Sequence, residues 1–286
     1  MIDIQPKNFK IILWDMDGTL LDFLPAERNA ITTTMEYFHL PTCTDEMIGR
    51  YSKINEQHWK RMEVGEITKQ QVLEGRFEEF FKSEGILDFK DYKAFNDEYQ
   101  KRLGSKVFFH KDAYEIVENL KGKVKQYAVT NGTSVAQALK LKNSGFDKLF
   151  DGVFISDQIG YEKPAKEFFD FVEAHIEAVD KSEIIIIGDS LTSDMQGGNN
   201  MGVKCCWFNV GNKPVPVDGK PKLDYIISDS EDKTLRIWDI KNNKQKCQNL
   251  LFLTWIMILQ ILVSEDLITA VAIGELEKLL MMFLET

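Results

Sequence analysis

The chain has 286 residues, of which 44% are hydrophobic and 28% charged, so it can form one large globular domain or a core with a second module. Its net charge of −10 argues against binding of nucleic acid polymers, because such proteins usually carry a basic face. The charge does not exclude a small anionic substrate, since a bound metal ion can reverse the local field.

The N-terminal segment MIDIQPKNFK contains an early acid and lacks the apolar stretch of a secretion signal. The cysteines form no CxxC pair and no zinc spacing. Adjacent Cys205 and Cys206 lie in the apolar run KCCWF, and we expect them to be core residues in a reducing compartment. These features predict a cytoplasmic protein.

The first predicted strand covers residues 9–14, and the segment WDMDGTLLD begins at its end. Two carboxylates, Asp15 and Asp17, therefore follow the strand directly, and Gly18 comes next. Taken alone, this DxDGT segment is also compatible with a turn followed by a helix cap.

Residues 23–107 contain no convincing strand. Glycines punctuate this region, and the segment ITKQQVLEGRFEEFF places Ile67, Val72 and Phe77 near one helical face. We expect an amphipathic bundle, with its aromatic residues in the core, inserted between the first strand and the rest of the sheet. The predicted helices cover residues 25–39, 44–64, 66–84 and 88–103.

Short apolar runs alternate with helical segments over the next part of the chain. Four consecutive isoleucines, residues 184–187, show no polar alternation and predict a strand buried on both faces, as in a parallel sheet. The alternation predicts an α/β domain with a doubly wound parallel sheet. The predicted strands are 126–130, 152–156, 183–188, 205–210 and 224–228, and the predicted helices are 112–121, 134–145 and 165–176.

The sequence changes character after about residue 230. Residues 228–240, SDSEDKTLRIWDI, resemble the latter part of a WD-type propeller blade, but a single part-blade cannot bury itself, which favours chance similarity or a fused fragment. The apolar stretch 250–263 is shorter than the ~20 residues of a membrane span. A buried helix, a self-association surface and an artefact of the gene model all remain open for it. We therefore expect a core from residues 1–22 and 108–230, a helical module at 23–107 and an anomalous tail at 231–286.

Polar side chains follow four of the predicted strands. In open α/β sheets, ligands bind beyond the carboxyl ends of the strands, so these side chains are expected to converge. Clustered carboxylates repel one another unless a cation is bound, and oxygen ligands favour Mg²⁺. A lysine and a hydroxyl could then hold phosphate oxygens. The residues are Asp15 and Asp17, Thr130 and Asn131, Lys163, and Asp189 with Asp194.

This pattern suggests a mechanism for phosphoryl transfer. Asp15 can attack phosphorus and form an aspartyl-phosphate, while Asp17 can protonate the leaving oxygen and then deprotonate the attacking water. Each motif alone is weak, because Asn131-Gly132 is a common turn, Lys163 could be a solvated lysine, and GDSLTSD could cap a helix. Their order, each after a predicted strand, is much harder to ascribe to chance.

These motifs resemble those of the haloacid-dehalogenase superfamily of phosphatases. The similarity rests on DMDGTL (15–20), VTNG (129–132), EKP (162–164) and GDSLTSD (188–194), and covers roughly residues 8–230. The resemblance implies an inserted helical type-one cap that closes over the site and selects the substrate. It further implies Asp15 as nucleophile and Asp17 as acid/base, Mg²⁺ held by Asp15, the Asp17 carbonyl and Asp189, Asp194 orienting metal-bound water, and phosphate binding at Thr130, Asn131 and Lys163.

A finer similarity is to the house-cleaning pyrimidine 5′-nucleotidases of this superfamily. It rests on the segments 20–23, 51–68, 131–145 and 188–209, and implies hydrolysis of nucleoside monophosphates, including non-standard pyrimidines. In the cap, Asn55, His58 and Trp59 are candidates for substrate contact, with Trp59 able to stack on a base; bundle packing is the alternative. The segment FHKDA (109–113) departs from the family, whose members commonly have Pro-Gly before the alanine, and so does the tail.

Other functions remain open on the sequence alone. A metal-independent haloacid dehalogenase would share the fold, but Asp17 and the pair Asp189 and Asp194 argue against it, because halide displacement needs neither an acid nor a metal site. Another small phosphate, such as phosphoglycolate or a sugar phosphate, fits the motifs equally well, because only the cap distinguishes substrates. A sugar-phosphate mutase is a variant of that possibility. A non-enzymatic interaction protein is suggested by the tail.

Overall fold

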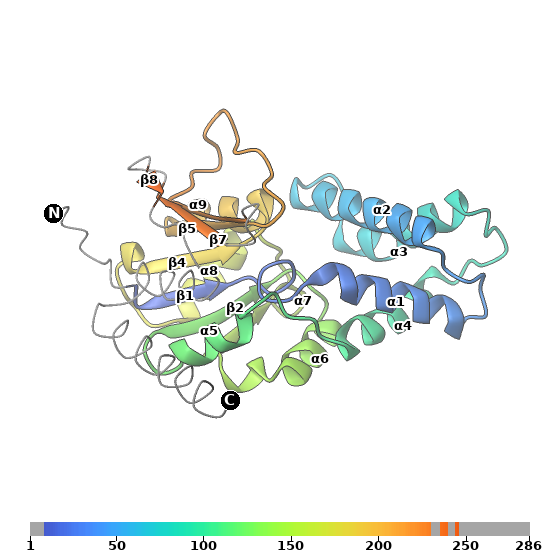
Figure 1. Ribbon diagram of the computed structural model, residues 1–286, viewed down its shortest axis with the longest axis horizontal. Coiled ribbons are helices and arrows are strands. Elements are labelled where there is room, and N and C mark those ends of the chain that lie inside the picture. Colours follow the sequence, from blue (N-terminus) through green and yellow to red (C-terminus); the bar gives the residue numbers. More distant parts are fainter. Residues whose placement is uncertain (1–8, 230–234, 240–243, 246–286) are drawn as a thin grey trace, which may run out of the picture.

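The computed structural model describes residues 9–229, 235–239 and 244–245. A single sheet lies at its centre, with the strand order β3-β2-β1-β4-β5-β6-β7-β8 (Figure 1). The first six strands are parallel, whereas β7 and β8 add antiparallel pairs at one edge. The strands are β1 (Ile11–Trp14), β2 (Lys125–Thr130), β3 (Gly152–Ile155), β4 (Ile184–Gly188), β5 (Lys204–Asn209), β6 (Tyr225–Asp229), β7 (Leu235–Asp239) and β8 (Lys244–Gln245).

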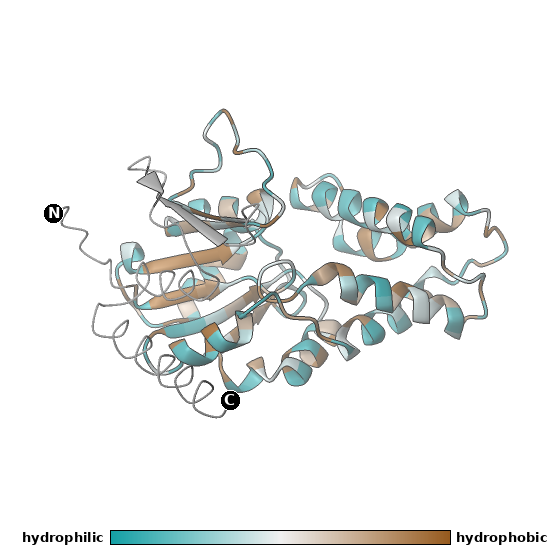
Figure 2. Cartoon of the chain, in the orientation of Figure 1, coloured by the Kyte–Doolittle hydropathy of each residue, from teal (hydrophilic) through white to brown (hydrophobic). Residues whose placement is uncertain are grey.

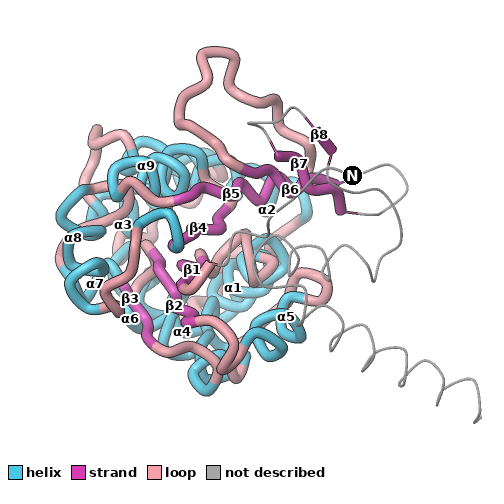
Figure 3. The backbone as a smooth tube through the Cα atoms, turned by 90° about the vertical axis from the view of Figure 1, so that its left-hand side faces the viewer, coloured by secondary structure: helices cyan, strands magenta, loops and turns pink. Residues whose placement is uncertain are grey.

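Helices cover both faces of this sheet. In Figure 3, α8 and α9 lie on one side of the strands and α5 on the other. The central strands β1 and β4 are apolar along their length, and Figure 2 shows them in brown. The helices that follow β2 along the chain are α6 (Ser134–Ser144), α7 (Ser156–Ile159), α8 (Lys166–His175) and α9 (Gln196–Met201), and α5 (Ala113–Leu120) precedes it.

Strand β4 shows why the isoleucine run forms a central strand. Ile185 and Ile187 pack in the cluster on the α5 side, whereas Ile184 and Ile186 pack on the opposite side with Phe168 of α8. All four isoleucines are at most 2% exposed. A strand between two helical layers needs apolar side chains on both faces, so the predicted doubly wound parallel sheet is confirmed.

Four long helices separate β1 from β2 along the chain and extend beyond one end of the sheet (Figure 1). They enclose an aromatic core in which Phe77, Phe95 and Tyr99 are fully buried. The predicted helical insert with an aromatic core is therefore confirmed. Its helices are α1 (Phe23–Tyr37), α2 (Asp45–Glu63), α3 (Lys69–Ser83) and α4 (Tyr92–Ser105).

The last helix of this insert begins later than predicted. The sequence suggested a helix over 88–103, but α4 begins at Tyr92. The Asp91 side chain accepts a hydrogen bond from the Ala94 amide at 3.0 Å, which makes Asp91 the N-terminal cap. The prediction at 88 was wrong because it followed the apolar pattern and missed this cap.

The sheet continues past residue 230. Strand β7 lies within the segment that resembles part of a propeller blade, and it pairs antiparallel with β6, with Ile227 opposite Ile237. The segment thus extends the α/β sheet in the part of the chain that the structure describes. The apolar stretch 250–263 lies outside the described residues. Within them, no helix has both the length and the apolarity needed to cross a membrane.

Candidate active site

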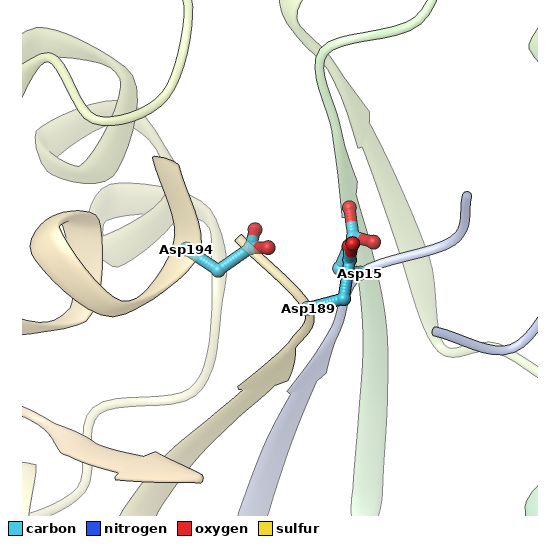
Figure 4. A group of neighbouring side chains, drawn as sticks. All are labelled: Asp15, Asp189 and Asp194. Carbon is cyan, nitrogen blue, oxygen red and sulfur yellow. The ribbon is translucent and has the colours of Figure 1, made fainter. Parts of the chain in front are cut away.

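The carboxyl ends of β1 and β4 bring three carboxylates together. These strands are neighbours in register, and the Asp15 amide donates to the Ile187 carbonyl at 2.9 Å. Asp15 and Asp189 therefore leave the sheet side by side, and the short π-helical turn Leu191–Met195 adds Asp194 (Figure 4). One oxygen from each of the three carboxylates lies within 4.8 Å of the others.

Lys163 contacts two of these three carboxylates. Its ammonium donates to Asp15 Oδ1 at 2.8 Å, to Asp194 Oδ1 at 2.6 Å and to the Val129 carbonyl at 2.8 Å. The residue is only 1% exposed, so the alternative of a solvated lysine is wrong. Loop 160–164 carries this side chain to the site from the end of β3.

Asn131 fixes the backbone of that loop. Its side-chain oxygen accepts from the Lys163 amide at 2.8 Å, and its side-chain nitrogen donates to the Lys163 carbonyl at 2.9 Å. Thr130, which ends β2, is 2% exposed and accepts a hydrogen bond from the Gly132 amide at 3.1 Å. The side chain of Asn131 therefore holds Lys163 in position in this structure.

Gly18 allows the turn after β1 to approach Asp189. Its φ is +93°, a conformation that L-residues rarely adopt, and an added Cβ would lie 2.8 Å from the Asp189 carboxylate. Thr19, the next residue, donates to Asp15 Oδ2 at 3.0 Å. Both Asp15 oxygens thus have a donor, one from Lys163 and one from Thr19.

The electrostatics of the cluster show an excess of negative charge. Loss of water, the neighbouring charge of Asp194 and, less, Asp17 raise the pKa of Asp15 to about 7, although Lys163 opposes this. Loss of water also raises the pKa of Asp189, again with Asp15 and Asp194 contributing. Burial alone would lower the pKa of Lys163, but the two carboxylates beside it hold its pKa above the usual value. One lysine does not balance three carboxylates, and this close set of oxygen ligands fits a hard divalent cation such as Mg²⁺.

Asp17 is held by side chains of α6. Its Oδ1 accepts from Lys140 Nζ at 2.5 Å and its Oδ2 accepts from Gln137 Nε2 at 2.7 Å. Sequence reasoning missed both partners, because a lysine and a glutamine in a helix are usually solvated. The two residues lie in the segment 131–145 that carried the finer family resemblance, and their spacing puts both on one face of α6, but neither signal identifies Asp17 as their partner.

A cavity of about 170 Å³ lies between these residues and the helical insert. Trp59 lines it, together with Arg76 and Gln100. Asn55 lies behind this wall: it donates to Glu27 at 2.7 Å and accepts from Arg76 at 2.8 Å. The structure thus places Trp59 in contact with the cavity and Asn55 in the buried network that holds Arg76.

The third cap candidate, His58, is involved in packing within the helical insert. Its Nδ1 lies 2.9 Å from the Ile54 carbonyl, and its Nε2 lies 3.7 Å from Glu79. At the C-terminal end of α2, Glu63 accepts hydrogen bonds from Ser190 and Thr192, which follow Asp189 in the chain. The insert therefore contacts the loop that carries the carboxylates.

The chain is similar to hydrolases and nucleotidases of known sequence. The chain is 33% identical over 213 residues to the putative HAD-hydrolase YfnB of Bacillus subtilis, covering 73% of this chain and 87% of YfnB. It is 33% identical to the pyrimidine 5′-nucleotidase PynA of Streptococcus pneumoniae (70% and 84% covered) and 28% identical to the pyrimidine 5′-nucleotidase YjjG of Escherichia coli (72% and 88%).

Solved structures show the same fold. The crystal structure of magnesium-bound YfnB from Bacillus subtilis superposes with a TM-score of 0.68 at 33% identity, covering 73% of this chain and 93% of that one. An L-2-haloacid dehalogenase from Xanthobacter autotrophicus, at 19% identity and a TM-score of 0.53, shares the fold alone. Residues 12–208 match the family described as haloacid dehalogenase-like hydrolase, so the resemblance seen in the sequence is confirmed: the chain belongs to the haloacid dehalogenase-like hydrolases.

Proposed function

We propose that this hydrolase is a Mg²⁺-dependent phosphomonoesterase that works through an aspartyl-phosphate on Asp15 and acts on pyrimidine nucleoside monophosphates. The observation that carries the proposal is the contact of a buried lysine, Lys163, with Asp15 and Asp194 at the edge of a cavity. In this proposal residues 1–22 and 108–230 are the catalytic core, and residues 23–107 are a cap that selects the substrate.

In the proposed reaction Asp15 is the nucleophile and Asp17 is the general acid and base. An oxygen of Asp15 forms a bond to phosphorus as the bond to the leaving oxygen breaks, and Asp17 gives that oxygen a proton. Water then attacks the phosphoryl group and loses a proton to Asp17, which restores the Asp15 carboxylate and releases phosphate. Thr130 and the loop held by Asn131 bind the phosphate oxygens, and Lys163 does so in exchange for one of its three present acceptors.

Mg²⁺ would be held by the side chains of Asp15 and Asp189 and the backbone carbonyl of Asp17, with Asp194 beside it. When bound, the ion would offset the negative charge of the carboxylates and of the phosphate. Lys163 donates to Asp15 directly and in this way keeps that carboxylate in place.

The choice of pyrimidine nucleotides rests on the relatives named pyrimidine 5′-nucleotidases and on the cap side of the cavity. There, Trp59 offers an aromatic face for stacking, and Arg76 and Gln100 offer polar groups. Halide displacement is not favoured, because the dehalogenase structures are similar in fold alone and that reaction has no use for the proton donor Asp17.

Phosphate release from a substrate panel tests the proposed function. With Mg²⁺ present, we expect release from UMP, dUMP and dTMP to be faster than from AMP, phosphoglycolate and a sugar phosphate. Preference for a non-nucleotide phosphate would retain the chemistry and reject the nucleotidase assignment. No release from any of the six by folded protein, with or without Mg²⁺, would contradict the proposal.

Metal binding can be measured without turnover. Because Mg²⁺ would bind only the folded arrangement of carboxylates, we expect it to stabilise the protein by about 2.7 kcal/mol at one hundred times its Kd. Thermal unfolding with and without MgCl₂ measures this gain, and Asp189→Asn should abolish most of it. An equal gain in wild type and variant would show that Asp189 does not hold the ion.

A further inference from the structure

We infer that Lys140 and Gln137 of α6 are positioning residues that together hold the carboxylate of Asp17, and that this hold sets the rate of acid-assisted departure of the leaving group. The inference rests on the proposed function, in which Asp17 is the acid/base. It concerns two residues that lie outside the four core motifs, within the segment 131–145, and to which the sequence analysis assigned no role.

The contacts define a clamp, by which we mean the pair Lys140 and Gln137. Each donates to a different oxygen of Asp17, at 2.5 Å and 2.7 Å, so the carboxylate is held at both oxygens. Both clamp residues are 1% exposed, whereas the Asp17 side chain remains 23% exposed. The clamp residues are thus almost inaccessible to solvent, and they line the same cavity as the carboxylate that they hold.

Burial makes this arrangement costly unless the groups are paired. A buried ammonium loses its hydration, and the Asp17 carboxylate is the partner that compensates Lys140. Among the described residues, Gln137 Oε1 is buried and has no hydrogen-bond partner. The Gln137 amide therefore donates to Asp17 through its nitrogen, while its buried oxygen, which lacks a hydrogen-bond partner, costs free energy of folding.

The surroundings fix the clamp in turn. A Cβ at Gly132 would lie 2.1 Å from Gln137 Nε2, so the backbone of the VTNG segment confines the glutamine side chain. Lys140 Nζ lies 5.5 Å from the centre of the Phe23 ring at the start of α1. On the same helix, Ala136 packs in the core of the cap with Leu103 of α4. Helix α6 is therefore held by both the core and the cap.

The consequence concerns the leaving group. In the first step the bond between Asp15 oxygen and phosphorus forms, the ester P–O bond breaks, and its electron pair stays on the leaving oxygen, which takes the proton from Asp17. A nucleoside 5′-oxygen needs this proton because an alkoxide is a poor leaving group. A p-nitrophenolate leaves as a stable anion and does not need it.

The test compares these two leaving groups. We expect Lys140→Met to lower kcat/KM for dUMP by about 10²-fold, the scale of a 1 Å misplacement of a reacting group, and to change kcat/KM for p-nitrophenyl phosphate far less. Gln137→Met should act in the same direction with a smaller loss. Lys142→Met, which removes a positive charge from the exposed side of the same helix, should leave both values unchanged.

The outcomes separate the clamp from the proposed function. Equal losses for both substrates, or no loss in either clamp variant, would overturn the clamp. Circular dichroism and the thermal midpoint check folding, and Gln137→Met decides the question if Lys140→Met does not fold. Asp17→Asn serves as the reference: if it shows no preferential loss with dUMP, then the acid role of Asp17 in the proposed function fails, whatever the clamp variants do.

Discussion

Replacing Asp15 with asparagine is expected to lower the rate of phosphate release by on the order of 10⁶-fold. Losses on this scale follow the removal of a catalytic nucleophile that acts together with its neighbouring groups. The substitution keeps the size of the side chain but replaces a carboxylate with a neutral amide, which is a poor nucleophile. It also changes the groups that Lys163 and Thr19 contact. Phosphate release from dUMP at saturating Mg²⁺ measures the loss.

A matched control lies in the same loop. Asp22→Asn removes a carboxylate that makes no capping hydrogen bond with α1, and we expect it to retain activity. Asp15→Ala guards against conversion of the introduced asparagine back to aspartate. Turnover close to wild type in both Asp15 variants would remove this residue from the reaction and with it the proposed mechanism.

Asp17→Asn is expected to slow hydrolysis of dUMP by about 10²–10⁴-fold, the usual contribution of a general acid or base. The amide can accept from Lys140 and donate elsewhere, but it cannot give a proton to the leaving oxygen or take one from water. The loss should appear in kcat and in kcat/KM, because both steps of the reaction use this group. Steady-state kinetics with dUMP measures it.

The choice of substrate sharpens this prediction. With p-nitrophenyl phosphate, Asp17→Asn should hardly change the rate of phosphoryl transfer to Asp15. Hydrolysis of the aspartyl-phosphate should be as slow in this variant as it is with dUMP. A variant whose only defect is a raised KM, with kcat unchanged for both substrates, would assign Asp17 to binding and contradict its acid/base role.

Much of the fold follows from local patterns in the sequence. The isoleucines of β4 have no polar alternation, and such a strand is stable only between two apolar layers. The proximity of the carboxylates after β1 and β4 could be predicted from the sequence, because neighbouring parallel strands end at the same edge of the sheet. In the structure Trp14 is paired with Ile187, so the two strands end side by side as expected.

The parts that could not be predicted depend on packing between distant segments. Lys140 and Gln137 are ordinary residues for a solvated helix, and only the placement of α6 against the turn after β1 gives them a carboxylate partner. Arg76 is similar: it is 1% exposed in the cap and bonds Asn55 and Asn96 from two other helices. Sequence spacing within one helix carries no information on such pairings.

A burst experiment with the Asp17→Asn protein tests the central claim most directly. This variant should transfer the phosphoryl group of p-nitrophenyl phosphate to Asp15 but hydrolyse the aspartyl-phosphate slowly. We predict a burst of nitrophenol equal to the amount of enzyme, followed by slow turnover, and a phosphoryl group on the tryptic peptide of residues 11–28. Steady turnover without a burst, or a phosphoryl group on another peptide, would contradict an aspartyl-phosphate at Asp15.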